Sequence, residues 1–204
     1  MSNLKFYLIT LFFSVKPALN REVGKKLSCR IRNRMKSCYM EINKRKSEEK
    51  GIMKFHRMFL ITGLSLYRAM RDELGEMYDP VETIHKMFSR SRMFKCIKIA
   101  AFFVRRSKDP YNSFLLFLGP GNERFFPCPP WEKFEIELVN GTGWRQNKCP
   151  FHAFFKDEVA NELTKAYCDL DKRIAELVSG HIKLERQHTL ANGDNWCDFY
   201  YYQT

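Results

Sequence analysis

The chain has 204 residues, 45% of them hydrophobic, and a formal net charge of +12. A domain of about 150 residues buries about 70% of the surface of its unfolded chain, so this length suits one domain with an additional segment. Residues 1–50 carry 13 Lys and Arg against 4 Asp and Glu, whereas residues 51–204 carry 22 against 19. This nearly neutral balance argues against a nucleic-acid-binding domain in residues 51–204.

The first 50 residues form a basic extension, which the pattern predicts to be either disordered or helical. The apolar stretch at 6–15 is too short to span a bilayer, which needs about 20 residues, and it is a poor match to a signal sequence. The basic run that follows is typical of a solvated arm, which can also bind acidic lipid or nucleic acid. A start of translation at Met40 or Met53 is a further alternative.

Helical periodicity dominates the middle of the chain. Apolar residues recur at steps of three and four between residues 59 and 77, as in an amphipathic helix. Asp79-Pro80 predicts the cap and first residue of the next helix. The apolar stretch at 93–118 predicts one or two further helices, broken at Asp109-Pro110, and glycines and prolines then predict a loop.

Strand-like patterns begin at residue 134. Apolar and acidic residues alternate over 134–138, which predicts a half-buried strand that continues toward Cys149. Helices are predicted from Pro150 and at 159–178. Two more strands are predicted at 181–190 and 196–202, joined by a five-residue turn.

We therefore predict an α+β fold: an antiparallel sheet of about 3–5 strands with helices packed on one face, and a helical N-terminal half. The domain is placed at 51–204 and the extension at 1–50. The seven cysteines are odd in number and widely spaced, which favours reduced thiols and a cytoplasmic protein.

Cys149 is the first residue that points to chemistry. Pro150 suits the first position of a helix, which places Cys149 at the N-cap. The partial positive charge of a helix N-terminus stabilises a thiolate, so we expect a lowered pKa for this thiol. Cys149 is then a candidate nucleophile or metal ligand, and a purely structural cysteine is the alternative.

A second candidate group lies in the helix that contains Cys168 and Asp171. At about 100° per residue, both lie on one shoulder of the apolar stripe, whereas Asp169 projects to the opposite side. A carboxylate at the edge of a buried face needs a partner. Asp171 is therefore the stronger functional candidate of the two aspartates.

The strand predicted at 181–190 places Arg186 and His188 on its apolar face. In the next strand, Cys197 shares a face with Phe199. An inward-facing arginine needs an anionic partner, which is either Asp171 or a substrate carboxylate. A structural ion pair is the alternative interpretation.

The cofactor is left open by the sequence, and a divalent metal such as zinc is one alternative. Cys149, Cys168 and Cys197 are candidate ligands, with His152 and Asp171 nearby in the sequence. The signal is weak because three separate elements would have to converge. The chain has no Gly-rich phosphate loop, serine elbow or HExxH motif, which disfavours nucleotide hydrolysis and standard serine or zinc protease chemistry.

The order of these motifs resembles a known family. CPFH at 149–152, CDLD at 168–171, R-x-x-T-L-A-x-G at 186–193 and CDF at 197–199 are similar to the L-2-amino-thiazoline-4-carboxylic acid hydrolase family. The resemblance covers about residues 54–202. It implies a hydrolase that opens a cyclic amidine (thiazoline) ring to an N-carbamoyl-cysteine-type product.

Roles for the matching residues rest on this resemblance and on geometry. Arg186 would bind the substrate carboxylate, with Thr189 and Gly193 also in the substrate-binding set. Asp171 would hydrogen-bond the amidinium. Cys149 would attack directly, with His152 or His188 as base, or else a base or metal would activate water.

Two other classes of function remain open. The same fold can serve as a non-catalytic module that binds a small ligand or a metal. Alternatively, the protein acts on nucleic acid or acidic lipid through residues 1–50, which is the less favoured alternative. The sequence leaves the oligomeric state open, a homo-oligomer included.

Overall fold

The computed structural model describes residues 15–45, 51–75 and 78–204 of a chain that divides into two compact units, residues 1–96 and 97–204. The apolar stretch predicted at the N-terminus lies outside the described residues, apart from its last residue, Val15. The predicted division into an extension at 1–50 and a single domain at 51–204 stays a prediction.

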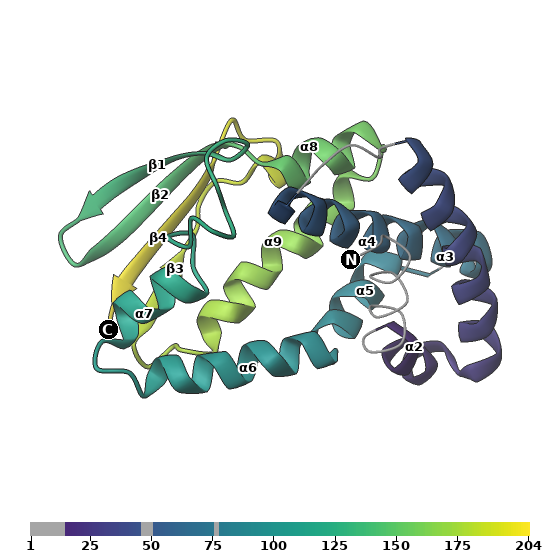
Figure 1. The fold of residues 1–204 in the computed structure, drawn as a ribbon, viewed down its shortest axis with the longest axis horizontal. Helices are drawn as coiled ribbons and strands as arrows, with labels where there is room; N and C mark the ends of the chain where they lie inside the picture. The colour runs from purple at the N-terminus through teal and green to yellow at the C-terminus, as the bar shows by residue number, and fades with distance from the viewer. Residues whose placement is uncertain (1–14, 46–50, 76–77) are drawn as a thin grey trace. The chain divides into compact units, whose positions relative to one another are not determined.

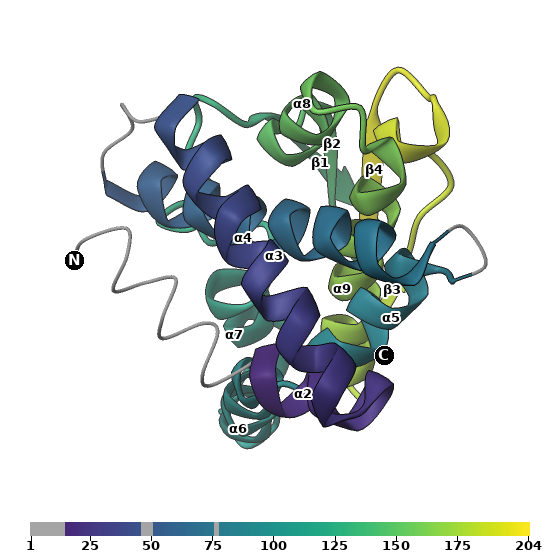
Figure 2. The ribbon, with the colours of Figure 1, turned by 90° about the vertical axis from the view of Figure 1, so that its right-hand side faces the viewer.

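The first unit is helical. It contains α2 (Lys16–Val23), α3 (Lys25–Arg45), α4 (Gly51–Leu74) and α5 (Pro80–Ser89), which Figure 1 shows in order. α3 crosses and packs against α4 (Figure 2), and α2 contacts both α3 and α5. The buried residues of α3 recur at helical spacing and form its face toward α4: Ser28, Ile31, Met35, Cys38, Tyr39 and Ile42.

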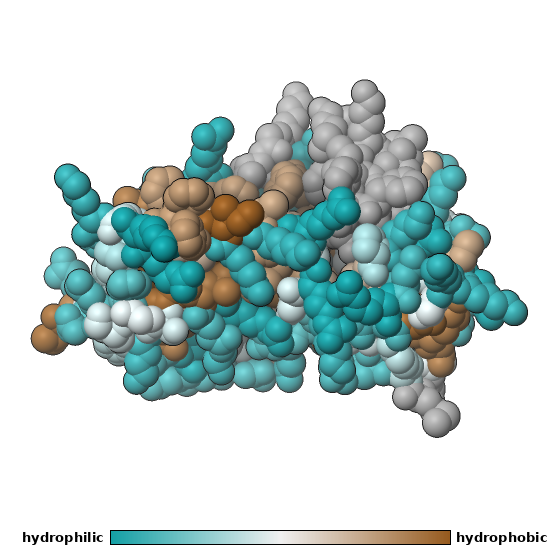
Figure 3. Space-filling view, turned by 90° about the horizontal axis from the view of Figure 1, so that it is seen from below, coloured by the Kyte–Doolittle hydropathy of each residue, from teal (hydrophilic) through white to brown (hydrophobic). Residues whose placement is uncertain are grey.

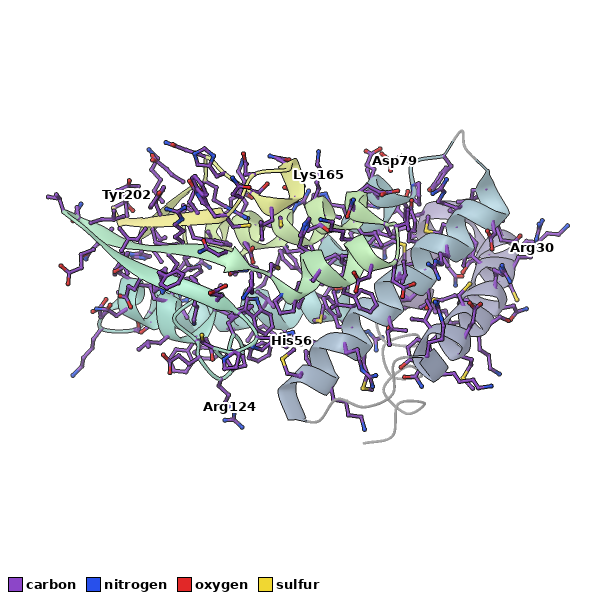
Figure 4. The ribbon with its side chains drawn as sticks, turned by 90° about the horizontal axis from the view of Figure 1, so that it is seen from above. Arg30, His56, Asp79, Arg124, Lys165 and Tyr202 are labelled. Atoms are coloured by element: carbon purple, nitrogen blue, oxygen red, sulfur yellow. The ribbon has the colours of Figure 1, made fainter. Side chains whose placement is uncertain are left out.

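The cap predicted at Asp79 is confirmed. Its Oδ1 accepts hydrogen bonds from the backbone N–H groups of Val81 at 2.8 Å and Glu82 at 3.0 Å, and Pro80 occupies the first helical position. These bonds satisfy two of the N–H groups that a helix start leaves without an internal partner. Asp79 stands at the start of its helix in Figure 4.

The second unit combines helices with one sheet. α6 (Arg92–Arg105) runs across the boundary at residue 96, and Asp109 caps α7 (Pro110–Phe117). The predicted break at Asp109-Pro110 is therefore confirmed. The remaining elements are β1 (Glu132–Leu138), β2 (Gly141–Lys148), α8 (Pro150–Asp157), α9 (Asn161–Glu176), β3 (Ile182–Glu185), the short 3-10 helix η2 (Leu190–Asn192) and β4 (Cys197–Gln203).

The four strands form an antiparallel sheet in the order β1-β2-β4-β3. One face of this sheet packs against α6, α7 and α9, where Trp144, Phe199 and Tyr201 meet Phe114 and Val178 in a common core. The α+β class, the antiparallel sheet with helices on one face and the helical N-terminal half are confirmed.

Two boundaries differ from the prediction. The strand expected to run from residue 134 toward Cys149 is a hairpin, because the chain turns between Leu138 and Gly141. The strand expected at 181–190 ends at Glu185. Beyond Glu185, the carboxylate of Asp198 accepts hydrogen bonds from the backbone N–H groups of Gln187 and His188, so these groups do not bond to a neighbouring strand.

The surface of the second unit carries exposed apolar side chains among its charges. The face seen from below shows such hydrophobic residues (Figure 3), and Phe103, Leu116 and Phe117 are each more than half exposed. No helix within the described ranges is long and apolar enough to cross a bilayer.

Gly141 permits the close approach of β2 to β4. A Cβ atom at this position would overlap the backbone carbonyl oxygen of Tyr201. We predict that Gly141→Ala lowers the free energy of unfolding by about 3 kcal/mol, because a backbone atom cannot rotate away as a side chain can. Urea denaturation of the purified variant measures the change.

Gly180→Ala is the matched control. Its added Cβ would meet no atom within 4 Å, so the free energy of unfolding should change by less than about 1 kcal/mol. Equal stability of Gly141→Ala and the wild type would contradict the described pairing of β2 with β4.

Candidate active site

A pocket of about 70 Å³ lies in the second unit, between the inner face of the sheet, α9, the start of α8 and the loop before β1. It has room for a few water molecules. Its reactive lining groups are the thiols of Cys149, Cys168 and Cys197, the Asp171 carboxylate and the Arg186 guanidinium. Four segments of the chain therefore contribute to one site: the start of α8, α9, the residues after β3, and β4.

Aromatic rings form much of the pocket wall. On the helical side, the Phe151 ring lies edge to face with Trp131 at 5.7 Å and with Tyr167 at 5.9 Å between centroids. On the sheet side, Tyr201 packs against Phe114 at 5.6 Å. Apolar walls with a few convergent polar groups are the usual form of a small-molecule site.

Arg186 is the central polar group of the pocket. Its Nη1 donates to the Cys168 carbonyl oxygen at 3.1 Å and lies 3.5 Å from Asp171 Oδ2. Its Nε donates to the Asp198 carbonyl oxygen at 3.2 Å, and the guanidinium carbon sits 4.1 Å from the centre of the Phe199 ring. Among the described residues, Nη2 is buried and has no hydrogen-bond partner. The Nη2 group, with its two N–H donors, therefore remains for a ligand.

Asp171 carries an altered carboxyl group. About 38% of its side-chain area is accessible, yet protein atoms surround it, and this desolvation raises the pKa of the carboxyl to about 6. The positive charge of Arg186 opposes the rise only in part. The carboxyl group is therefore mostly ionised at neutral pH, and its pKa is close enough to this pH for it to accept and release a proton.

Asp198 positions the segment that carries Arg186. This aspartate is 1% exposed, and its Oδ1 accepts the N–H groups of Gln187 at 2.8 Å and His188 at 2.9 Å. Its backbone carbonyl accepts from Arg186 Nε. The residue acts on the site through Arg186 and does not line the pocket.

Cys149 occupies the predicted position, but its expected activation is wrong. It is the N-cap of α8, with Pro150 at the first helical position. Burial raises the pKa of its thiol to about 11, and the backbone N–H groups of His152 and Phe151 oppose this only in part. Burial also raises the pKa of Cys168 to about 12 and that of Cys197 above its ordinary value. The desolvation of the thiol outweighs the helix terminus.

Comparison with protein families identifies the chain. The profile described as L-2-amino-thiazoline-4-carboxylic acid hydrolase matches residues 51–201. The chain belongs to this family. No curated protein matches the chain.

Five of the residues predicted from the sequence line the pocket of this family member: Cys149, Cys168, Asp171, Arg186 and Cys197. The structure thus brings together Arg186, the candidate group for binding a substrate carboxylate, with the Asp171 carboxylate and the three thiols. The catalytic and binding roles assigned to them stay predictions. Asp169 is exposed, as expected for the other aspartate.

The other four predicted residues are not part of the pocket lining. The His188 ring lies 5.1 Å from the Trp196 ring between centroids, and its Nδ1 lies 3.6 Å from Asp194 Oδ1. Its side chain is 43% exposed, because the strand that would have turned it inward ends at Glu185. Thr189 Oγ1 accepts from Asn192 N at the start of η2, and Gly193, at φ +94°, ends it.

His152, the fourth, follows Cys149 by three residues on α8. Burial, and to a smaller extent Lys156, lowers the pKa of its imidazole. The ring is therefore biased toward the neutral form that a general base requires. Its distance in sequence from Cys149 is short, but the ring does not line the pocket.

A metal site is not assembled in the described part of the chain. No group of three or more His, Cys, Asp and Glu side chains there is arranged to hold a metal ion. The thiols of Cys149, Cys168 and Cys197 line the same pocket without forming such a group. Zinc binding by these residues stays a prediction.

Sequence reasoning missed Thr164, Gln146 and Lys133 as pocket residues. Helical spacing could have predicted Thr164, because it precedes Cys168 by four residues and so lies on the same side of the helix as Cys168 and Asp171. Lys133 and Gln146 lie on β1 and β2, and their positions depend on a hairpin that the sequence did not predict.

The raised thiol pKa values predict slow alkylation. A pKa near 11 instead of 9.0 leaves about 100-fold less thiolate at neutral pH, which a more nucleophilic sulfur offsets in part. Iodoacetamide should therefore modify Cys149 at least roughly tenfold more slowly than the exposed Cys29 or Cys96. Peptide mass spectrometry over a time course measures these rates, and equal rates would contradict the described burial.

Proposed function

We propose that this protein hydrolyses L-2-amino-thiazoline-4-carboxylic acid or a close cyclic amidine, opening the ring to an N-carbamoyl-cysteine-type product. The observation that supports this most is the pairing of Arg186 with Asp171 on one small pocket. The named substrate carries a carboxylate and an amidinium. A cation and a carboxylate side by side match the two charges of such a zwitterion.

Arg186 binds the substrate carboxylate in this proposal. Its Nη2 points to this role because it is buried and without a partner among the described residues, while its other nitrogens are already bonded. A charge-assisted hydrogen bond in a desolvated site is stronger and more directional than one in water. Arg186 is thereby held in place before the substrate arrives.

Asp171 acts on the amidine end. As a carboxylate it keeps the amidinium protonated, which makes the carbon between nitrogen and sulfur more electrophilic. It then accepts a proton from water as the water oxygen bonds to this carbon, and this proton passes to sulfur as the C–S bond breaks. The remaining hydroxyl proton leaves to solvent as the urea carbonyl forms. One water molecule is consumed, and the ring becomes a urea group and a thiol.

The thiols have a secondary part in this mechanism. With a pKa near 11, Cys149 is protonated at neutral pH, which favours water over Cys149 as the nucleophile. Direct attack by Cys149, with His152 as base, is the competing mechanism. Trapping of a covalent adduct on Cys149 by mass spectrometry would support the competing mechanism.

A second candidate is a module that binds a small ligand without turnover. It is favoured by the absence of both predicted histidines from the pocket lining. Binding of the amidine with no release of thiol, measured with a thiol-reactive dye, would support it. A cytoplasmic location remains a prediction. Homo-oligomerisation and the less favoured binding of nucleic acid or acidic lipid through residues 1–50 remain open alternatives.

Arg186→Lys tests the carboxylate clamp. Lysine keeps the charge but cannot reproduce the planar set of donors, so we expect kcat/KM for L-2-amino-thiazoline-4-carboxylic acid to fall roughly 10- to 100-fold. Lys183→Ala, whose side chain is exposed on β3, is the control and should leave kcat/KM unchanged. Full activity of Arg186→Lys would reject the proposed clamp.

Asp171 gives the reaction a pH dependence. Because desolvation raises its pKa to about 6, the active carboxylate form is present above this pH and is lost below it. We expect kcat/KM to fall about tenfold per pH unit below pH 6 and to level off above it. Asp171→Asn should remove this limb of the profile together with most of the activity, and an unchanged limb would assign it to another group.

A further inference from the structure

Thr164 is a buried polar residue that the proposed reaction leaves without a role. It is 1% exposed, lies near the start of α9 and lines the pocket. Its Oγ1 is buried, and within the described ranges no group hydrogen-bonds to it. A hydroxyl that is buried and unbonded destabilises a folded protein, so native structures almost always supply it with a partner.

A hydroxyl in a helix often donates to the carbonyl oxygen four residues earlier. Thr62 and Ser65 in α4 donate to the carbonyl oxygens four residues earlier, at 2.7 Å and 2.6 Å. Thr164 makes no such bond to Ala160, although both residues are buried. Since the pocket is the space that Thr164 borders, a bound molecule is the natural partner.

The helix fixes which part of a ligand Thr164 meets. Thr164, Cys168 and Asp171 follow one another on one side of α9, and a rise of 1.5 Å per residue separates Thr164 from Asp171 by about 10 Å along the axis. Arg186 is bonded at the level of Cys168 and Asp171. A ligand with its carboxylate on Arg186 therefore extends toward Thr164 at its other end.

We propose that the Thr164 hydroxyl accepts a hydrogen bond from the exocyclic amino group of the substrate and so selects 2-amino-substituted rings. An amidinium offers only N–H donors, and a hydroxyl oxygen has two acceptor lone pairs. A pocket built to hydrogen-bond an amino group discriminates against the ligand that lacks it. The inference rests on the proposed function, because the carboxylate at Arg186 orients the ring.

Two stable ligands that differ only in the amino group test the role of Thr164. 2-Aminothiazole-4-carboxylate and thiazole-4-carboxylate have an aromatic ring that resists hydrolysis, so isothermal titration of the full-length protein measures binding alone. The variant Thr164→Val removes the hydroxyl at nearly constant shape, and Thr164→Ser retains it. Lys165→Ala is the control, since Lys165 follows Thr164 but extends outward (Figure 4).

We expect Thr164→Val to weaken binding of the amino compound about tenfold and to leave thiazole-4-carboxylate within about twofold of the wild type. Thr164→Ser and Lys165→Ala should bind both compounds like the wild type. Equal effects of Thr164→Val on the two compounds, or no effect on either, would overturn the inference.

The melting temperature of the ligand-free protein distinguishes a structural role of the Thr164 hydroxyl from a role in ligand binding. If the hydroxyl is unbonded in the free protein, Thr164→Val melts at the wild-type temperature or above it. A melting temperature lowered by several degrees would mean that the hydroxyl is bonded within the protein, and this would also overturn the inference.

The same experiments distinguish a failure of the proposed reaction from a failure of the role proposed for Thr164. A wild type that binds both thiazoles with the expected dependence on Thr164, but does not hydrolyse L-2-amino-thiazoline-4-carboxylic acid, would reject the reaction and support the role of Thr164. A wild type that binds neither compound would reject both.

Discussion

The arrangement of the pocket in the second unit depends on how the protein compensates the buried positive charge of the Arg186 guanidinium. Arg186 is largely withdrawn from bulk water, and its contacts reach two elements. These contacts are the Cys168 carbonyl and Asp171 on α9, and the Asp198 carbonyl and the Phe199 ring on β4. An isolated charge in such a place would be strongly unfavourable. Helix α9 and the central strand β4 are therefore held in register by the residue that also faces the ligand.

The chemistry of the site follows from the same desolvation. Burial raises the pKa of Asp171 to about 6 and that of Cys149 to about 11, so one environment makes the carboxyl group suitable for proton transfer and the thiol poorly suited to attack. This separates the roles of two residues that the sequence presents as equal candidates. A hydrolytic water activated by a carboxylate is the mechanism that this environment favours.

How much of this the sequence could predict depended on whether the signal was local. Local patterns predicted the cap at Asp79, the break at Asp109-Pro110, the position of Cys149 before Pro150 and the shared side of Cys168 and Asp171, and the structure contains all of them. His188 was misplaced because strand alternation was extended beyond Glu185. Beyond the strand, the Asp198 carboxylate, thirteen residues after Glu185, binds the backbone N–H groups of Gln187 and His188, and no local pattern reveals such a contact. The pKa of Cys149 could not be predicted for a related reason, because burial depends on the assembled fold.

The position of β4 in the sheet has a consequence for how the pocket is built. Strand β4 has neighbours on both sides, in the order β1-β2-β4-β3, but Cys197 and Phe199 lie in its first part, which pairs with β2 and not with β3. Arg186 instead follows a four-residue edge strand and is anchored by side-chain bonds to β4. The floor of the pocket therefore belongs to the paired part of the sheet, whereas the segment with Arg186 is held beside it by side-chain bonds to Asp198.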